Sequence, residues 1–419
     1  MTDRDLGTRD AGLSADSGDA PDGGIVTLSI AELDADPHGV FRRYRPLTPF
    51  IAHESGSYIV LRAGDVERFS RDPRLRQSET EYPEIHGITG GLLFDLFKYG
   101  MLMSNGAVHR QRRSPFSRTF AAKLIMEMRP RIRRTAEELV TEWYEEEDVD
   151  LVQRYAALIP ARTISDLLGL PKDDIPEFTS LVYQVTRVVS FLFQPEDLPE
   201  LEEAARRLFG YVEEILSARR RKPREDFLSA FVASADAAGE LSPFEIITQI
   251  VTLIIGGTDT TRVAAAEQVA LLLQDRAQWD EVCRDPALIP GAVVEALRYE
   301  PSVASLARIP LEDIEVDGRV LPAGQFLILS TMSAMRDEQL YARPDVFDIH
   351  RTDHPRLPLV FGGGPHRCLG EALARVELEE GLAVLSSRIP QLELAADPPR
   401  VEGHSGIRRI GEMRVAWRR

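Results

Sequence analysis

The stretch Phe361-Gly-Gly-Gly-Pro-His-Arg-Cys368-Leu-Gly370 decides the fold of this 419-residue chain. It places one thiol after a glycine-rich loop and directly before an apolar pattern of helical period, carried by Leu369, Ala372, Leu373, Val376, Leu382 and Leu385. The sulfur of Cys368 therefore meets the positive end of a predicted helix, where a thiolate is favoured. The glycines let the backbone approach a bulky planar group and point N–H groups at the sulfur.

These surroundings are those of a thiolate that ligates haem iron. A lone cysteine is most often an ordinary buried core residue. Here, however, Phe361, three glycines, His366 and the following helix stand at fixed offsets from Cys368. The whole constellation favours a haem ligand over a structural cysteine.

The same stretch resembles the proximal-loop signature of the cytochromes P-450, Phe-x-x-Gly-x-His/Arg-x-Cys-x-Gly, with matches at Phe361, Gly364, His366, Cys368 and Gly370. By this resemblance Cys368 is the axial ligand of one haem b, and Phe361, Gly362 and Gly370 contact the cofactor. The resemblance covers the chain from about residue 33 onward. It implies a mainly α fold with small β-sheets, in which a triangular prism of helices encloses the haem.

The length and the first residues bear on domain organisation. At 419 residues the chain could form two or three average domains, but the resemblance favours one domain over residues 25–419. Residues 1–24 are rich in Asp, Gly and Ser and lack an apolar core, so we expect a disordered tail and not a signal peptide. The longest apolar run, residues 250–255, is too short to span a bilayer. We therefore expect a cytoplasmic protein without a membrane anchor.

Cysteine count and charge exclude several classes of protein. Two cysteines, Cys283 and Cys368, cannot form a disulfide framework or a Cys-rich metal site, which leaves Cys283 as a core thiol. The net charge of −17 argues against nucleic-acid binding, which requires a basic surface. Against this acidic background, basic residues gather in one stretch and beside the Cys368 loop: His109, Arg110, Arg112, Arg113, Arg118, Arg356 and Arg367. They form either a solvated helix face or a docking patch for an acidic redox partner.

Helical periodicity dominates the chain after residue 64. Apolar residues at three-to-four-residue spacing predict helices over residues 124–144, 151–170, 174–189, 199–221, 224–237, 243–274 and 288–299. Short alternating segments predict strands at 51–53, 58–61, 314–320, 326–330 and 413–417. Residues 77–105 and 191–198 fit neither pattern, and a long irregular segment in a compact domain is usually functional. By the resemblance they are the loop over the distal haem face and the lid between two mobile helices.

The predicted helix 243–274 begins at the capping box Ser242-Pro-Phe-Glu245 and would be roughly 48 Å long. Its centre carries two glycines, which lower helix propensity, and several polar residues, whose burial costs desolvation free energy. The Thr260 hydroxyl can bond the Gly256 carbonyl and open a groove at Gly256 and Gly257 that suits dioxygen. Asp259 and Thr260 would pass protons there, as the matching oxygen-activation pattern of the resembled family implies. The alternative is a helix kink without chemistry.

Further charged residues fall into two groups. Glu295 and Arg298 stand three apart among apolar neighbours, so they share one helix face and are predicted to be buried. By the resemblance they form a structural Glu-x-x-Arg motif, completed by Arg351. Buried haem carboxylates need cationic or hydrogen-bonding partners. The resemblance assigns that role to His109, Arg113, Arg308 and His366.

The resemblance implies a monooxygenase that inserts one oxygen atom from O2 into a C–H bond of a small organic molecule. A ferredoxin with its reductase would supply the electrons, because no flavin or nicotinamide domain fits in the remaining length. The residues expected to line the substrate pocket are mostly apolar and indicate an apolar substrate: Leu93, Phe94, Phe97, Met101, Val188, Phe191, Val251, Ile255, Val303, Leu306 and Ile407.

Two other functions use the same cysteine. A haem-thiolate sensor needs no acid and alcohol on the long helix, and Asp259 with Thr260 speaks against it. A peroxide-driven oxygenase would share the fold, need no redox partner and be expected to lack this proton relay.

Overall fold

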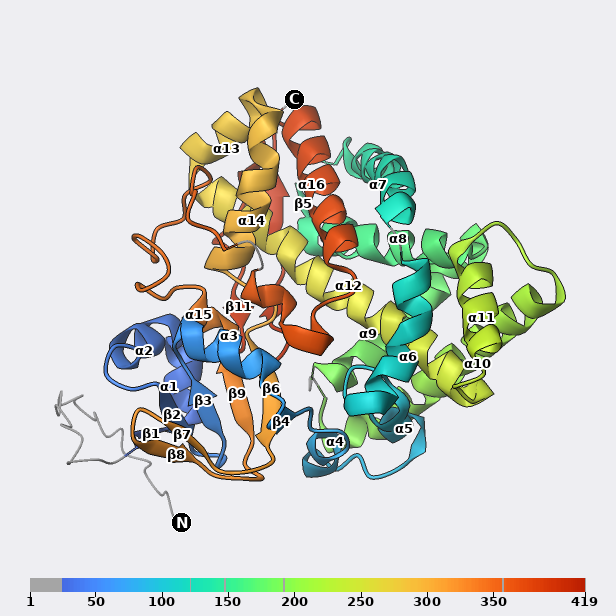
Figure 1. The fold of residues 1–419 in the computed structure, drawn as a ribbon. Helices are drawn as coiled ribbons and strands as arrows, with labels where there is room; N and C mark the ends of the chain where they lie inside the picture. The colour runs from blue at the N-terminus through green and yellow to red at the C-terminus, as the bar shows by residue number, and fades with distance from the viewer. Residues whose placement is uncertain (1–24, 121, 147, 191–192, 356–357, 419) are drawn as a thin grey trace, which may run out of the picture.

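The computed structural model describes residues 25–120, 122–146, 148–190, 193–355 and 358–418. Three of our expectations lie outside these residues, namely the disordered tail over residues 1–24, Phe191 in the pocket and Arg356 in the basic patch. The described part is mainly helical with small sheets, as predicted, and its outline is roughly triangular in Figure 1.

Helices form most of the molecule. The longer ones are α5 (Gly91–Tyr99), α6 (Gly106–Thr119), α7 (Ala122–Trp143), α8 (Leu158–Leu168), α9 (Ile175–Val189), α10 (Leu198–Arg221), α11 (Phe227–Ala238), α12 (Pro243–Gln274), α13 (Arg276–Arg284), α14 (Ile289–Tyr299) and α16 (Glu371–Arg388). Short ones are α1 (Ile30–Ala35), α2 (Pro37–Tyr44), α3 (Ala63–Arg71), α4 (Glu81–Ile85) and α15 (Thr331–Ala334).

Helix α12 crosses the molecule and forms its central axis (Figure 1). It has the predicted bounds, and the predicted capping box is present because the Ser242 side chain accepts a hydrogen bond from the Glu245 backbone. It packs against α8, α9, α10, α14 and α16, so most of its residues are buried. A helix in contact with neighbours on all sides can place a few polar side chains at fixed positions inside the protein.

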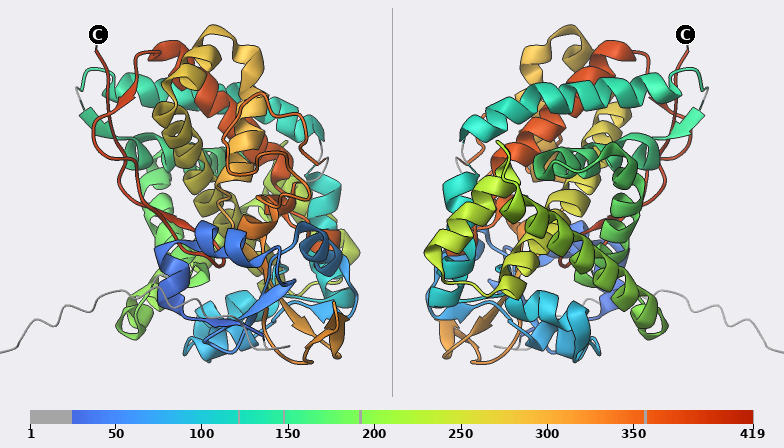
Figure 2. Two further views of the ribbon diagram at one scale, coloured as in Figure 1. Left: turned by 90° about the vertical axis from the view of Figure 1, so that its left-hand side faces the viewer. Right: turned by 90° about the vertical axis from the view of Figure 1, so that its right-hand side faces the viewer.

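A six-stranded sheet lies at one corner, in the order β1-β2-β3-β9-β6-β4. Its strands are β1 (Thr27–Leu28), β2 (Phe50–His53), β3 (Tyr58–Val60), β4 (Leu75–Arg76), β6 (Ser305–Pro310) and β9 (Leu327–Ser330). Figure 2 shows this corner, with its blue and orange strands, at the base of the molecule, below the red α16 and the teal α7 that packs along it. Strand β6 was not predicted, and it brings Arg308 next to the Cys368 loop.

Two sequence predictions were wrong in detail. The predicted strand 314–320 is a hairpin of β7 (Ile314–Val316) and β8 (Arg319–Leu321), because Asp317 and Gly318 both adopt positive φ, as a tight hairpin turn requires. Residues 77–105 are not one irregular loop, since they contain the helices α4 and α5. The Glu202 carboxylate on α10 accepts the backbone N–H groups of Leu92 and Leu93 at 2.5 and 3.1 Å and so caps α5.

The remaining strands form three small sheets, one of which is the β7–β8 hairpin beside the six-stranded sheet (Figure 1). Strands β10 (Glu393–Leu394), β13 (Arg414–Ala416) and β5 (Asp148–Asp150) pair in that order, and β11 (Val401–Glu402) pairs with β12 (Arg409–Ile410). The predicted helix 151–170 is divided, because Val152–Ala156 is a π-helical turn that precedes α8. In the described part of the chain, no helix is both long and apolar enough to cross a bilayer.

Candidate active site

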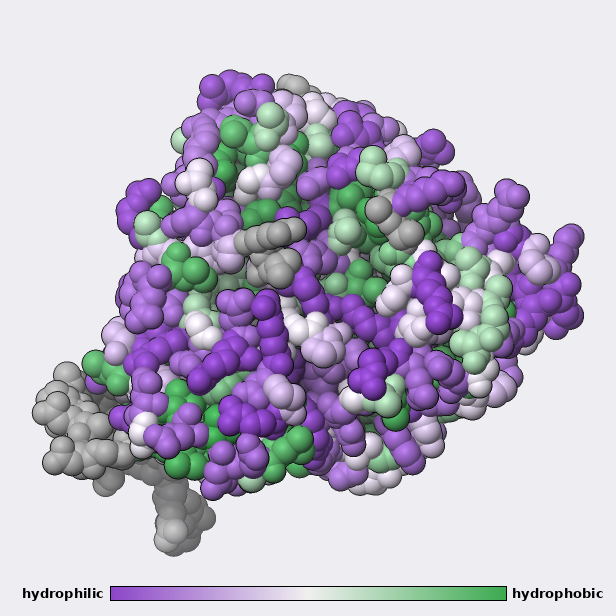
Figure 3. Space-filling view, viewed as in Figure 1, coloured by the Kyte–Doolittle hydropathy of each residue, from purple (hydrophilic) through white to green (hydrophobic). Residues whose placement is uncertain are grey.

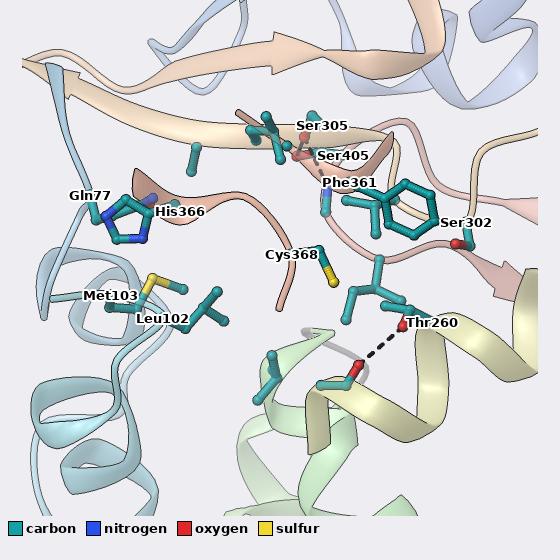
Figure 4. Close-up of a pocket in the computed structure, with 18 of the residues that line it drawn as sticks. Gln77, Leu102, Met103, Thr260, Ser302, Ser305, Phe361, His366, Cys368 and Ser405 are labelled. Atoms are coloured by element: carbon teal, nitrogen blue, oxygen red, sulfur yellow. Dashed lines mark hydrogen bonds between the residues drawn. The ribbon is translucent and has the colours of Figure 1, made fainter. Parts of the chain in front are cut away.

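A cavity of about 730 Å³ lies between α12, the Cys368 loop, α5 with the segment after it, and the six-stranded sheet. Most of its wall is apolar. Figure 4 shows Cys368 near the middle of this wall, with Gln77 and His366 on one side and Thr260 and Ser302 on the other. The Cys368 loop and the centre of α12, which lie far apart in the sequence, therefore meet at one cavity.

Local hydrogen bonds fix the loop that carries Cys368. The Cys368 backbone N–H donates to the Phe361 carbonyl at 2.8 Å, which closes the loop. The Arg367 guanidinium donates to the Gly362 carbonyl at 2.9 Å and to the Glu371 carboxylate at 2.6 Å. The Cys368 sulfur is exposed to the cavity and points toward the side where Thr260 lies (Figure 4).

The glycines of this loop serve two purposes. Gly362 and Gly370 both line the cavity, and Gly362 has φ +71°. A Cβ on Gly363 would stand 2.1 Å from the Ser70 hydroxyl, and one on Gly364 would stand 3.0 Å from the Ser70 carbonyl. Gly363 and Gly364 are thus required mainly by the close passage of α3, and not only by a planar ligand.

We expected the loop alone to favour a thiolate at Cys368, but the pKa of this thiol shows that it does not. Burial raises the pKa of Cys368 above its ordinary value. The Gly370 N–H and the guanidinium groups of Arg113 and Arg367 lower it, but they do not outweigh burial. A metal ion bound at this sulfur would supply the charge that keeps it a thiolate.

Four basic side chains line the cavity beside the loop, as predicted: His109, Arg113, Arg308 and His366. Burial lowers the pKa of Arg308 to about 10 and also lowers that of Arg113. Among the described residues neither guanidinium has a carboxylate partner; both donate to backbone carbonyls. Buried cations without counter-ions are costly, so this wall is suited to a ligand that brings its own carboxylates.

The two imidazoles on this wall are neutral at pH 7. Burial, together with the neighbouring basic groups, lowers the pKa of His109 to about 4 and that of His366 to about 3. Their ring centroids are 3.9 Å apart. Neutral imidazoles donate one hydrogen bond each. An open thiol, two uncompensated guanidiniums and two imidazole donors fit an iron porphyrin with two carboxylates.

The centre of α12 faces the cavity through Gly256, Gly257 and Thr260. The Thr260 hydroxyl donates to the Gly256 carbonyl at 3.2 Å, which is the predicted bond. A Cβ on Gly256 would meet nothing within 4 Å, so this glycine leaves open space. A Cβ on Gly257 would stand 2.7 Å from Ile164 Cδ1 on α8, so Gly257 is also required for helix packing.

Asp259 does not face the cavity, contrary to our expectation. Its carboxylate accepts two hydrogen bonds from Arg262, at 2.5 and 2.8 Å, and one from the Ser190 hydroxyl at 3.2 Å. Successive helix residues point about 100° apart, so Thr260 and Asp259 cannot both project into the same space. The Asp-x-x-Arg spacing in the sequence is the signal that could have revealed this ion pair.

The Glu-x-x-Arg motif is assembled behind the cavity. Arg298 and Glu295 form two hydrogen bonds at 2.7 and 2.8 Å and are fully buried. Arg351 lies 3.1 Å from the same carboxylate. Arg298 also donates to the carbonyls of Met335, Pro344 and Val346, so the motif holds the segment 335–351 against α14.

Six of the predicted pocket residues line the cavity: Phe97, Met101, Ile255, Val303, Leu306 and Ile407. Four do not, because Leu93, Val188 and Val251 are buried in the main core and Phe94 packs against it. Sequence reasoning missed several lining residues, among them Leu96, Leu102, Met103, Leu253, Ser302, Ser305 and Ser405. Periodicity identifies a buried face but does not tell a cavity wall from solid core.

The basic patch is smaller than predicted. Arg112 is buried, where it donates to the Glu245 carboxylate at 2.9 Å and to the Lys98 carbonyl at 3.0 Å. Arg110 and Arg118 on α6 are exposed. Hydrophilic side chains prevail on this face of the molecule (Figure 3).

Comparison with known proteins agrees with this geometry. The family model described as Cytochrome P450 matches residues 91–282 and 267–388. The chain is 42% identical over 388 residues to plant-inducible cytochrome P450-pinF1 of Rhizobium radiobacter, covering 93% of this chain and 92% of that protein. It is 35% identical to nocardicin C N-oxygenase of Nocardia uniformis subsp. tsuyamanensis, covering 76% and 79%.

Solved structures are also similar. The crystal structure of CalO2 has a TM-score of 0.85 at 28% identity and covers 93% of this chain and 97% of that one. Epothilone D-bound cytochrome P450epoK has a TM-score of 0.84 at 29% identity, with coverage of 92% and 97%.

Proposed function

Because the chain belongs to the cytochrome P450 family of oxygen-incorporating haem b enzymes, we propose that it inserts one oxygen atom from O2 into a small apolar organic molecule. The reaction would be C–H hydroxylation or a related oxidation. One observation carries this proposal: the Cys368 thiol and the groove on α12 at Gly256 and Thr260 line the same, largely apolar cavity. Curated relatives carry names as different as an N-oxygenase and an epoxidase, so the substrate is proposed from the cavity and not from them.

The cavity residues divide into separate roles. Cys368 would hold the haem iron, with Phe361, Gly362 and Gly370 beside it, and Arg113, Arg308, His109 and His366 would bind the two carboxylates. When bound, the haem supplies oxygen activation, aided by the electron density of a thiolate. Phe97, Met101, Ile255, Val303, Leu306 and Ile407 would contact the apolar substrate and exclude water.

Thr260 would hold a proton at Oγ1 inside the groove formed with Gly256 and Gly257. Asp259 would serve this hydroxyl indirectly, because its carboxylate is held by Arg262 and Ser190 outside the cavity wall. A proton on Asp259 can reach the groove only when that ion pair opens. The sequence-based assignment of Asp259 as a direct donor is therefore replaced by a role behind Thr260.

Replacing Thr260 with Ala tests the proposed reaction. We expect haem and ligand binding to persist, but product formed per NAD(P)H consumed should fall roughly tenfold or more, the scale of lost proton delivery, with hydrogen peroxide released instead. Thr258→Ala is the matched control, because the Thr258 hydroxyl is buried, bonds Ile254 and does not line the cavity. If Thr260→Ala formed as much product per NAD(P)H as wild type, the centre of α12 would have no role in proton delivery and would be only a kink in the helix.

Electrons would come from a ferredoxin and its reductase. The proposal is supported by exposed arginines on α6, which packs beside the Cys368 loop through the bond from Arg113 to the Arg367 carbonyl at 2.6 Å. Their contrast with the overall charge of −17 would favour an acidic partner at this face.

The double variant Arg110→Glu/Arg118→Glu should raise the Michaelis constant for an acidic ferredoxin. An exposed ion pair contributes up to about 1 kcal/mol, so each pair that is lost should raise this constant by roughly fivefold. Wild-type turnover should also fall as ionic strength rises. Arg284→Glu on α13, at the top of Figure 1, is the control and should behave as wild type. Salt-independent turnover with hydrogen peroxide alone would instead favour a peroxide-driven oxygenase.

A further inference from the structure

One part of the cavity wall is polar but is not used by any of the roles assigned above. It consists of Ser305 at the start of β6, His404 and Ser405 in the turn between β11 and β12, and His53 at the end of β2, all of which line the cavity. We call these residues the polar strip. Figure 4 shows Ser305 and Ser405 next to each other and apart from His366.

Hydrogen bonds to neighbouring segments hold the polar strip in place. The Gly406 N–H donates to the Ser305 hydroxyl at 3.0 Å, so the turn between β11 and β12 is fixed against β6. The Asp34 carboxylate on α1 lies 2.8 Å from His404 Nδ1, and the ring centroids of His404 and His53 are 5.6 Å apart. The strip is therefore one continuous surface whose polar groups are already positioned.

The two serines leave one hydroxyl hydrogen without an acceptor. Their oxygens are 3.3 Å apart, so one hydroxyl donates to the other. The Ser305 oxygen already accepts the Gly406 N–H, and each hydroxyl has only one hydrogen to give. Whichever serine donates within the pair, the other has an O–H that is free for a ligand.

His53 adds a second donor. The Ser55 backbone N–H donates to His53 Nδ1 at 3.2 Å, so Nδ1 carries no proton and Nε2 carries it in the neutral ring. Burial lowers the pKa of His53, so the ring is neutral at pH 7. The side chain is only 7% exposed, and Nε2 is buried without a hydrogen-bond partner in the described part of the chain. An unpaired buried donor costs free energy, which a ligand oxygen would recover.

The charge of the wall decides which kind of oxygen fits. Within the described ranges no lysine lines the cavity, and its two guanidiniums, Arg113 and Arg308, are assigned to the haem carboxylates. A carboxylate at the polar strip would therefore lack a fixed cation. Two hydrogen-bond donors in a largely apolar wall match an uncharged oxygen instead.

We propose that the polar strip binds a hydroxyl or carbonyl oxygen of the substrate, whose remaining surface is apolar. The substrate class is then an apolar skeleton that already carries an oxygen substituent. This inference rests on the proposed monooxygenase function and names the kind of molecule on which it acts.

Matched ligands test the strip in the haem-loaded wild-type protein. One set is decane, decanol, decanone and decanoate, and the other is decalin with its alcohol, ketone and carboxylate. The dissociation constants are measured from the shift of the haem absorption band. The alcohol and the ketone should bind roughly fivefold or more tightly than their hydrocarbon, the scale of one hydrogen bond. They should also bind more tightly than the carboxylate.

Two variants locate the bound oxygen. The double variant Ser305→Ala/Ser405→Ala removes the free O–H, since a single replacement would leave a hydroxyl hydrogen on the remaining serine. His53→Phe removes the second donor and keeps the bulk of the ring. Each should reduce the preference for alcohol over hydrocarbon by roughly fivefold and leave the affinity for the hydrocarbon unchanged. Ser165→Ala is the matched control, because the buried Ser165 hydroxyl on α8 donates to the Ala161 carbonyl at 2.8 Å and does not line the cavity.

Three results would overturn the proposal. One is a ligand set in which no alcohol or ketone binds more tightly than its hydrocarbon, and another is a carboxylate that binds most tightly. The third is a preference for the alcohol that stays at the wild-type value in both variants, which would place the oxygen elsewhere in the cavity. Should one variant not fold, the other decides.

The two proposals can fail separately, because the affinities do not depend on turnover. If the carbon monoxide spectrum of the reduced protein lacks a thiolate band, the proposed function fails, and equilibrium dialysis of the same ligands still decides the role of the strip. If that band is present and only the preference for an oxygen substituent is missing, the polar strip alone is excluded.

Discussion

Replacing Cys368 with His is expected to abolish the long-wavelength absorption band of the reduced, carbon monoxide-bound protein, while some haem remains bound. Turnover should fall by more than about 100-fold. Loss of a group that only hydrogen-bonds a metal ligand already lowers metal affinity or activity by about 10–100-fold. The reason is the position of the sulfur, which opens onto the cavity and has no side-chain hydrogen-bond donor among the described residues.

Cys283→Ser is the matched control for this experiment. Cys283 packs against the main core, does not line the cavity, and has its pKa raised to about 11 by burial. It should keep both the band and the activity. A thiolate band that persists in Cys368→His would show that Cys368 is not the ligand, and the assignment of the cavity would have to be withdrawn.

Replacing Arg298 with Met is expected to lower the free energy of unfolding by about 3–5 kcal/mol, because it removes one partner of a fully buried ion pair. Glu295 would keep Arg351 at 3.1 Å, but the carbonyls of Met335, Pro344 and Val346 would lose their shared donor. Denaturant titration of the haem-loaded protein, followed by absorbance and circular dichroism, measures this loss.

Two further variants separate a buried pair from a surface one. Arg206→Met removes an exposed arginine that pairs with Glu203 three positions earlier, and stability should hardly change. In the double variant Glu295→Gln/Arg298→Met the buried carboxylate is removed as well, and Arg351 keeps its pair with Asp353 at 3.1 Å, so the loss should be no larger than in Arg298→Met. If Arg298→Met were as stable as wild type, the motif would not hold the segment 335–351 in place.

The acid–base chemistry shows how far local patterns reach. The sequence predicted the bounds of α12, its capping box and the bond from Thr260 to Gly256, because all three depend on residues within four positions of each other. It did not predict which way Asp259 turns, since that depends on Ser190 from a distant segment as well as on Arg262.

The same division holds for the rest of the molecule. Sequence alone determined the Cys368 loop, the Glu-x-x-Arg pair and the approximate bounds of α7, α9, α10, α11, α12 and α14, because hydrogen bonds and side-chain periodicity within a few residues decide them. Tertiary structure alone decided that Arg112 is buried against Glu245, that Glu202 caps α5 and that Gly363 makes way for α3. It also decided which apolar residues face the cavity and which fill the core. These features depend on contacts between segments that are far apart in the chain, and hydrophobic burial is not directional enough to specify such contacts from local pattern.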